Sequence, residues 1–318
     1  MAIYYIGRTA LDYWRWRAAT SWMFENPTPM QKPKLSCKPS SKSDVIAGCA
    51  QFVEEGNEIE LMVGSRKLAH RIAGISYAVC EKPLPPYSFH RINNGLYVAS
   101  PEFMFVGLSK GMSLFETCIL GCELIGTYVL RNDDERGFSQ CAPLASKESL
   151  QKTIDKADGF LGVKQARKAL PFLLENSASP METRVALLLT LPCRLGGYGL
   201  PKPSLNHSLQ LSHSQQLEMK RNEIRVDMAW PKSRLVIEYE STAWHSGNEK
   251  FIQDSKRRND IRSLGFDVTT ITLDEYKSQS SMDRIASDLA VKLGGRLRLE
   301  RIDRAKQHEL RRKLMYTT

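Results

Sequence analysis

The chain has 318 residues, with 45 Lys and Arg against 35 Asp and Glu, a formal net charge of +10 and a sequence pI of about 9.2. The length suits about two domains, and the positive balance favours a polyanionic partner such as DNA. No stretch approaches the roughly 20 apolar residues of a membrane-spanning helix, so we expect no membrane insertion. The aromatic N-terminus lacks the apolar core of a signal peptide, which predicts a cytoplasmic protein with reduced cysteines and no structural zinc.

Residues 1–145 are expected to form a smaller N-terminal accessory domain of α+β type. A loop rich in Pro, Ser and Lys at 23–43 precedes alternating helix-like and strand-like stretches. Ser-Pro-Glu at 100–102 has the pattern of a helix N-terminus, with a serine cap and proline in the first turn. The run YVASPEFMFVGLSKGMSLFETCILGCELIGTY resembles transcription-regulating antitoxins of abortive-infection type, in which a strand, SPE and an apolar helix also recur. The resemblance spans about residues 45–145 and implies a DNA-binding or regulatory domain. A generic domain that positions substrate is the alternative.

Residues 146–178 are expected to form a helical connector, because leucine and alanine recur there at helical spacing. Ser179-Pro180-Met181-Glu182 then fits a capping box at the start of a buried helix. Two roles remain open for Glu182: it caps this helix, or it reaches into a site formed by the strands that follow. The glycine-rich run at 196–199 lacks the context of a phosphate loop and predicts a flexible turn that lets a loop lie close to DNA.

The most informative segment is RVDMAWPKSRLVIEYE at 225–240. Two apolar runs meet at Pro-Lys-Ser, which predicts a β-hairpin. Residues two apart on a strand share a face, so Glu238 and Glu240 should lie side by side, with Asp227 on the neighbouring strand. Half-buried carboxylates repel one another and lose hydration, and Mg²⁺ or Mn²⁺ is a suitable counter-charge. The hairpin therefore predicts a hard-metal site. An ordinary hairpin with solvated acids is the alternative.

The pattern of Asp, ten residues, then Glu-x-Glu resembles the PD-(D/E)xK nuclease superfamily. With the later stretch DSKRRNDIRSLGFDVTTIT, the run RVDMAWPKSRLVIEYESTAWH is similar to an uncharacterised branch of that superfamily related to very-short-patch repair endonucleases. The resemblance covers roughly residues 175–290. It implies an α/β fold with a restriction-endonuclease-like core, a mixed sheet flanked by helices, over residues 179–293. The implied activity is that of a hydrolase that cuts phosphodiester bonds.

The resemblance also implies roles for individual residues. The three hairpin acids would hold one or two divalent ions at a scissile phosphate, and Glu182 matches an acid on the preceding helix. His245, which follows the second acidic strand, would bind a metal-water or shuttle a proton. Glu240 replaces the usual motif lysine, so catalysis would depend on His245, Lys256 or metal-bound water. The catalytic set implied is Asp227, Glu238, Glu240, His245 and Glu182.

Basic residues cluster in two places. The stretch from Glu249 to Leu264 predicts a helix, and the resemblance places its Asp254 and its basic residues near the site; a solvated basic face is the alternative. Residues 292–318 hold nine Lys and Arg against three acids, and 294–318 are expected to form a basic C-terminal helix. The alternative is a charged helix that favours solubility. Contacts with the DNA backbone, which are salt-sensitive, are expected from Lys256, Arg257, Arg258, Arg301, Arg304, Arg311 and Arg312.

Two functional hypotheses follow. The first is a Mg²⁺-dependent DNA endonuclease that acts in defence, mobile-element biology or DNA repair. The second is a catalytically inactive, nuclease-fold protein that binds DNA or regulates transcription, which the missing lysine and the antitoxin-like first part favour. A double-strand break requires two active sites, so a homodimer is one expected assembly. A partner protein from a defence or mobile-element system is another expected interaction.

Overall fold

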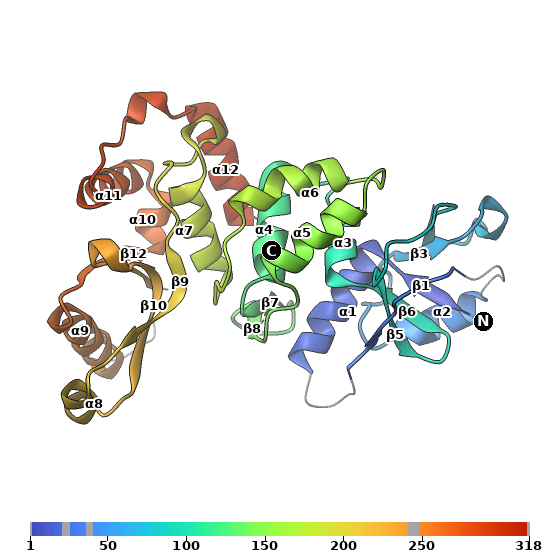
Figure 1. Ribbon diagram of the computed structural model, residues 1–318, viewed down its shortest axis with the longest axis horizontal. Helices are drawn as coiled ribbons and strands as arrows, with labels where there is room; N and C mark the ends of the chain where they lie inside the picture. The colour runs from blue at the N-terminus through green and yellow to red at the C-terminus, as the bar shows by residue number, and fades with distance from the viewer. Residues whose placement is uncertain (1, 21–25, 36–40, 241–247, 317–318) are drawn as a thin grey trace. The chain divides into compact units, whose positions relative to one another are not determined.

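The computed structural model is a mixed α/β protein that divides into two compact units, Met1–Leu173 and Leu174–Thr318 (Figure 1). Each unit has its own sheet and its own buried core. None of the helices within the described part of the chain is both long and apolar enough to cross a membrane. The residues that the structure describes are 2–20, 26–35, 41–240 and 248–316.

The first unit is built on a six-stranded mixed sheet in the order β2-β5-β6-β1-β3-β4. β1 pairs in parallel with β6 and antiparallel with β3, and β3 is parallel to β4. A separate two-stranded ribbon is formed by β7 and β8. The strands are β1 Ile3–Tyr5, β2 Thr28–Pro29, β3 Ile59–Val63, β4 Ile75–Val79, β5 Phe89–Asn93, β6 Leu96–Ala99, β7 Tyr128–Leu130 and β8 Phe138–Gln140.

Four helices of this unit, α2 to α5, begin at a serine that caps the helix N-terminus. Ser100 accepts the backbone N–H of Phe103 at the start of α3, and a full capping box of Ser113 and Glu116 starts α4. The helices of the predicted connector, α5 and α6, contact α3 and α4 and so belong to the first unit. The helices are α1 Gly7–Ala19, α2 Lys42–Cys49, α3 Pro101–Leu108, α4 Leu114–Leu124, α5 Lys147–Lys156 and α6 Val163–Ala169.

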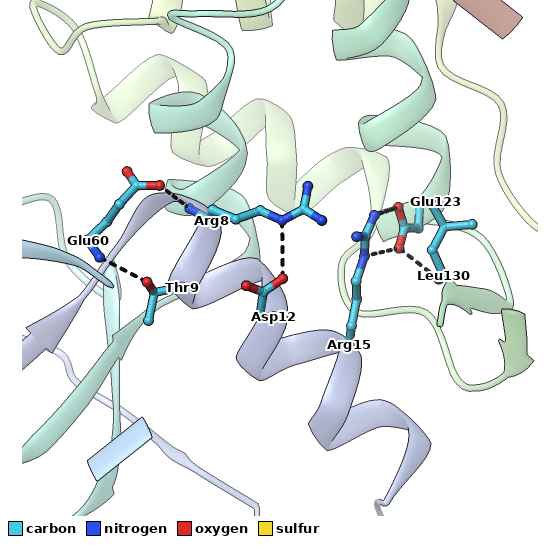
Figure 2. Close-up of polar contacts among 7 residues, drawn as sticks. All are labelled: Arg8, Thr9, Asp12, Arg15, Glu60, Glu123 and Leu130. Carbon is cyan, nitrogen blue, oxygen red and sulfur yellow. Dashed lines mark hydrogen bonds and ion pairs between the residues drawn. The ribbon is translucent and has the colours of Figure 1, made fainter. Parts of the chain in front are cut away.

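Polar contacts join α1 to the sheet and to α4 (Figure 2). Arg15 donates two hydrogen bonds of 2.8 Å to Glu123 of α4, whose side chain is 2% exposed. Glu123 also accepts the backbone N–H of Leu130 at 3.1 Å. At the start of the helix, Gly7 has a φ of 56°, and a Cβ there would lie 2.0 Å from a carboxylate oxygen of Glu60. Glycine is therefore required where the chain turns from β1 into α1.

The second unit has a four-stranded mixed sheet in the order β12-β11-β10-β9. β9, β10 and β11 are antiparallel neighbours, and β12 pairs in parallel with β11. α9 lies on one side of this sheet and α7 on the other (Figure 1). The mixed α/β class, with a mixed sheet flanked by helices, is thus confirmed. The elements are α7 Pro180–Thr190, β9 Ser204–Gln210, α8 His213–Met219, β10 Glu223–Trp230, β11 Leu235–Glu240, α9 Asn248–Ser263, β12 Asp267–Thr272, α10 Leu273–Lys277, α11 Gln279–Lys292 and α12 Arg304–Tyr316.

The predicted hairpin is confirmed as β10 and β11, which are joined by a short 3-10 turn at Pro231–Ser233. Arg234 completes the turn with a φ of 50°. Apolar side chains of the strands pack with Ile261 of α9, and each fully buried aliphatic side chain contributes about 1.5–3 kcal/mol. This packing fixes the positions of the strand ends that carry Asp227 and Glu238. It includes Leu209, Ile224, Val226, Val236 and Val268.

Candidate functional site

The register of the hairpin brings two of the predicted acids together. Met228 pairs with Ile237, and continuing the antiparallel register by one residue sets Asp227 opposite Glu238. Opposite residues on one face have Cβ atoms about 5 Å apart. The backbone hydrogen bonds between β10 and β11 end at this point. The Asp227 side chain bonds to the next backbone group of β11, because its Oδ2 accepts the N–H of Tyr239 at 2.7 Å. Asp227 is therefore held in one orientation by the neighbouring strand.

Glu182 approaches the same place from the first turn of α7. Its side chain is buried, at 7% exposed, and its Oε2 accepts the N–H of Ala178 at 2.8 Å. Ser179 caps the helix by accepting the N–H of Glu182. The structure thus shows a capping contact for Glu182 with an amide one residue earlier than a capping box predicts. Its role in a site stays a prediction, which the electrostatics below support.

The three carboxylates act on one another electrostatically. Burial raises the pKa of Asp227 to about 8, and the charges of Glu182 and Glu238 act in the same direction. The Tyr239 N–H and the guanidinium of Arg257 oppose this shift in the pKa of Asp227. Burial also raises the pKa of Glu182, where the Ala178 N–H opposes the shift and the charge of Glu238 adds to it. Acids from α7, β10 and β11 are therefore near enough for their charges to act on one another.

Arginines of α9 meet the acids of β11. Arg257 grips Glu238 with two hydrogen bonds, Nε to Oε2 at 3.0 Å and Nη2 to Oε1 at 3.2 Å, and also donates to the backbone oxygen of Arg225. Arg258 donates to Glu240 at 3.1 Å. Both acids thus face α9, as the two-residue period predicts. The negative charges that act on Asp227 are those of Glu182 and Glu238, whereas Glu240 is 39% exposed and pairs with Arg258.

The donor chemistry suits a hard cation, since Glu182, Asp227 and Glu238 offer only oxygen. As the side chains are placed, no three Asp, Glu, His or Cys residues in the described part of the chain are close enough to hold a metal ion. The guanidinium groups of α9 supply the positive charge beside Glu238 and Glu240. His245 lies outside the described residues, so its predicted role stays a prediction.

The residues predicted to contact nucleic acid fall into two groups. Lys256, Arg301 and Arg312 are exposed. The others make contacts within the second unit: Arg257 and Arg258 with β11, as above, and two arginines of α12. Arg304 makes two hydrogen bonds of 2.9 Å to Asp283 of α11. Arg311 is 7% exposed and donates to the backbone oxygen of Tyr276. Charge counting could not separate these groups, because it does not show which side of a helix packs.

Arg296 and Arg298 fall within the basic helix expected over 294–318 but were not among the residues predicted to contact nucleic acid. They lie in the loop after α11, since the helix α12 begins only at Arg304, and both are exposed. The available signal was the glycine pair at 294–295, which ends α11 and places the following basic residues in a loop.

The first unit has a hollow of about 320 Å³ beside α1. Its charged lining residues are three arginines and three acids, and two ion pairs among them are Arg8 with Asp12 and Arg131 with Asp133. Since these charges balance, the lining points to no single class of ligand.

Comparison with known proteins finds similar proteins but does not show a family for the chain. No family model matches the chain, and no solved structure matches it. It is similar to two uncharacterized proteins of Mycobacterium tuberculosis, one from each of two strains. Each is 30% identical over 145 residues, which cover 46% of this chain and 48% of the relative. The chain thus spans about half the length of these curated relatives.

Proposed function

We propose that the second unit is a metal-dependent deoxyribonuclease that hydrolyses phosphodiester bonds in defence, mobile-element biology or DNA repair. The observation that carries this proposal is that Glu182, Asp227 and Glu238, from α7, β10 and β11, act on one another's charge. The order of elements supports it: α7, the antiparallel β9 to β11, α9 and the parallel β12 follow the order of the restriction-endonuclease-like core that the resemblance implies.

The oxygen-only donor chemistry suits Mg²⁺ or Mn²⁺, and Glu182, Asp227 and Glu238 would hold the ion after their side chains move closer together than in the structure. When bound, such an ion activates water and stabilises the leaving oxygen. The chain's own groups orient these ligands. The Tyr239 N–H fixes the Asp227 carboxylate, and the Ala178 N–H fixes that of Glu182.

The arginines of α9 are the chain's means of holding substrate at this site. Arg257 donates to Glu238 and to the backbone oxygen of Arg225. If Glu238 turned toward a bound cation, the Arg257 guanidinium would be free of that carboxylate and would bind a phosphate oxygen. Lys256, the preceding residue, is exposed and adds a second positive charge. His245 remains our proposed proton carrier.

One observation favours a second candidate, a nuclease-fold protein that binds DNA without cutting it. The position of the motif lysine holds Glu240, and Arg258 neutralises this residue. No amine is then available at that position to polarise water, so binding could persist where turnover has been lost.

The test is incubation of the full chain with supercoiled plasmid and Mg²⁺ or Mn²⁺. We expect nicking by the wild type and a loss of about 100-fold or more in Asp227→Asn and Glu238→Gln, the range found when one charge-stabilising group is removed from an active site. Glu218→Gln, at an exposed position on α8, is the matched control and should cut normally. Cleavage that survives both site substitutions would discard the acidic site. A mobility shift without nicking would establish the non-cutting candidate instead.

A further inference from the structure

The second unit contains a hollow of about 400 Å³ between residues 193–201 and 290–301. Arg296, Arg298 and Arg301 line it and are exposed. No acidic side chain is among the described residues that line it. The charge of this hollow is therefore positive and unbalanced, in contrast to the paired charges beside α1.

The floor of the hollow, meaning the apolar part of its lining, is held in place by a hydrogen-bond network. Leu200, Leu297 and the buried ring of Tyr198 contribute to this floor. The Tyr198 hydroxyl donates to Asp283 at 2.8 Å, and Asp283 is itself gripped by both terminal nitrogens of Arg304. This part-buried network fixes the wall before any ligand arrives, so binding costs little reorganisation.

Two elements relate the hollow to the acidic site. Trp230 donates to the backbone oxygen of Pro201, a lining residue, at 2.9 Å, and lies three residues along β10 from Asp227. At the rise of a strand this is roughly 10 Å. Gly199, which also lines the hollow, donates to the oxygen of Leu191, which follows α7 nine residues after Glu182. At the rise of a helix this is roughly 14 Å.

We propose that this hollow binds a nucleotide of the substrate strand beyond the scissile phosphate. Phosphates of one strand follow one another at about 3.4 Å along the duplex axis, so each of these two backbone spans, roughly 10 and 14 Å, corresponds to about three to four nucleotides. Arg296, Arg298 and Arg301 bind the backbone phosphates, for which the guanidinium fork is suited, and the apolar floor takes a base. This inference rests on the proposed function, because the acids define where the strand is cut.

The test measures binding alone, by fluorescence anisotropy of a short labelled DNA strand with the full chain in EDTA over a series of salt concentrations. The variant is the triple substitution Arg296→Ala, Arg298→Ala and Arg301→Ala. Each lost phosphate contact to a single strand lowers the slope of log K against log salt by about 0.7, so we expect a slope smaller by about 2 and at least about a tenfold loss of affinity at low salt. A triple change of the same arginines to Lys keeps the charge and should keep most of the slope.

The control is a triple variant, Lys156→Ala, Lys164→Ala and Lys168→Ala, which removes the same charge at exposed positions on α5 and α6. Its slope of log K against log salt should be near that of the wild type. An unchanged slope in the arginine variant, or an equal loss in the lysine control, overturns the assignment. If the arginine variant lost binding of polyglutamate while its DNA binding stayed unchanged, the hollow would be a site for an acidic protein. That result would also overturn the assignment. Failure of the nuclease proposal is seen separately, as absence of plasmid nicking by the wild type in Mg²⁺.

Discussion

Burial and the charges of Glu182 and Glu238 both disfavour the ionised form of Asp227. Its pKa in the folded chain is about 8, against about 3.9 for an aspartate in the unfolded chain. A raised acid pKa means that the folded state binds the proton more tightly than the unfolded state does. The free energy of unfolding therefore falls as pH rises from about 4 to about 8, and the full cost is present above about pH 8.

Asp227→Asn should stabilise the protein in EDTA at neutral and alkaline pH. The amide oxygen can still accept the Tyr239 N–H while the repelled charge is gone, and we expect a gain on the order of 1–3 kcal/mol, a rise of a few degrees in Tm. Thermal unfolding followed between about pH 4 and pH 9 checks this, with Glu218→Gln as the neutral control. A variant that melts below the wild type would show that the carboxylate is needed for the fold.

The residues of the site differ in how far sequence could predict them. The pairing of Asp227 and Glu238 follows from strand alternation and the turn between the strands, both local properties. The contact of Arg257 with Glu238 does not, because it depends on how α9 rotates onto the sheet. The capping pattern of Glu182 was visible, but its burial beside Asp227 depends on the packing of α7.

Among the secondary-structure elements, helix caps and the β10–β11 hairpin were predictable because their signals lie within a few residues. Long-range ion pairs were not. Arg15 of α1 and Glu123 of α4 are 108 residues apart and form a nearly buried pair, with exposed fractions of 16% and 2%. Nothing in either helix taken alone marks its partner.

The Arg15–Glu123 pair predicts an asymmetric response to substitution. Arg15→Met leaves a buried carboxylate without its counter-charge and should cost about 3–5 kcal/mol. Adding Glu123→Gln removes that charge yet keeps an acceptor for the Leu130 N–H, so the double variant should recover much of the loss. Urea unfolding of the full chain measures both effects.

Arg8→Met is the control on the same helix (Figure 2). Arg8 pairs with Asp12 at 3.2 Å, but its side chain is 57% exposed, and exposed pairs contribute about 1 kcal/mol or less. If Arg8→Met and Arg15→Met lowered the free energy of unfolding equally, burial would not explain the contribution of the Arg15–Glu123 pair to stability.

At the scale of the whole molecule, chain length predicts about two domains, and the structure divides into two compact units. The division between Leu173 and Leu174 falls inside the stretch 146–178 that was expected to connect them. Apolar spacing identified the helices of this stretch, but it could not show which domain they would join. Tertiary packing decides that, since α5 and α6 find their apolar partners in α3 and α4.

The two units should fold independently. Each has a separate sheet and core, so fragments 1–173 and 174–318 should each show helical circular dichroism and a single cooperative unfolding transition. The second fragment alone should keep the salt dependence of DNA binding that we attribute to the arginine-lined hollow. A fragment 174–318 that aggregates or unfolds without cooperativity would show that the first unit is needed for its stability.

The grip of Arg257 and Arg258 on Glu238 and Glu240 has a consequence for the life of the protein in a cell. A newly made polypeptide can reach its native shape with Glu238 and Glu240 already paired and, unlike a zinc finger, it need not wait for a mineral ion to neutralise these two acids. Under the proposed function, magnesium would govern activity without being needed for folding.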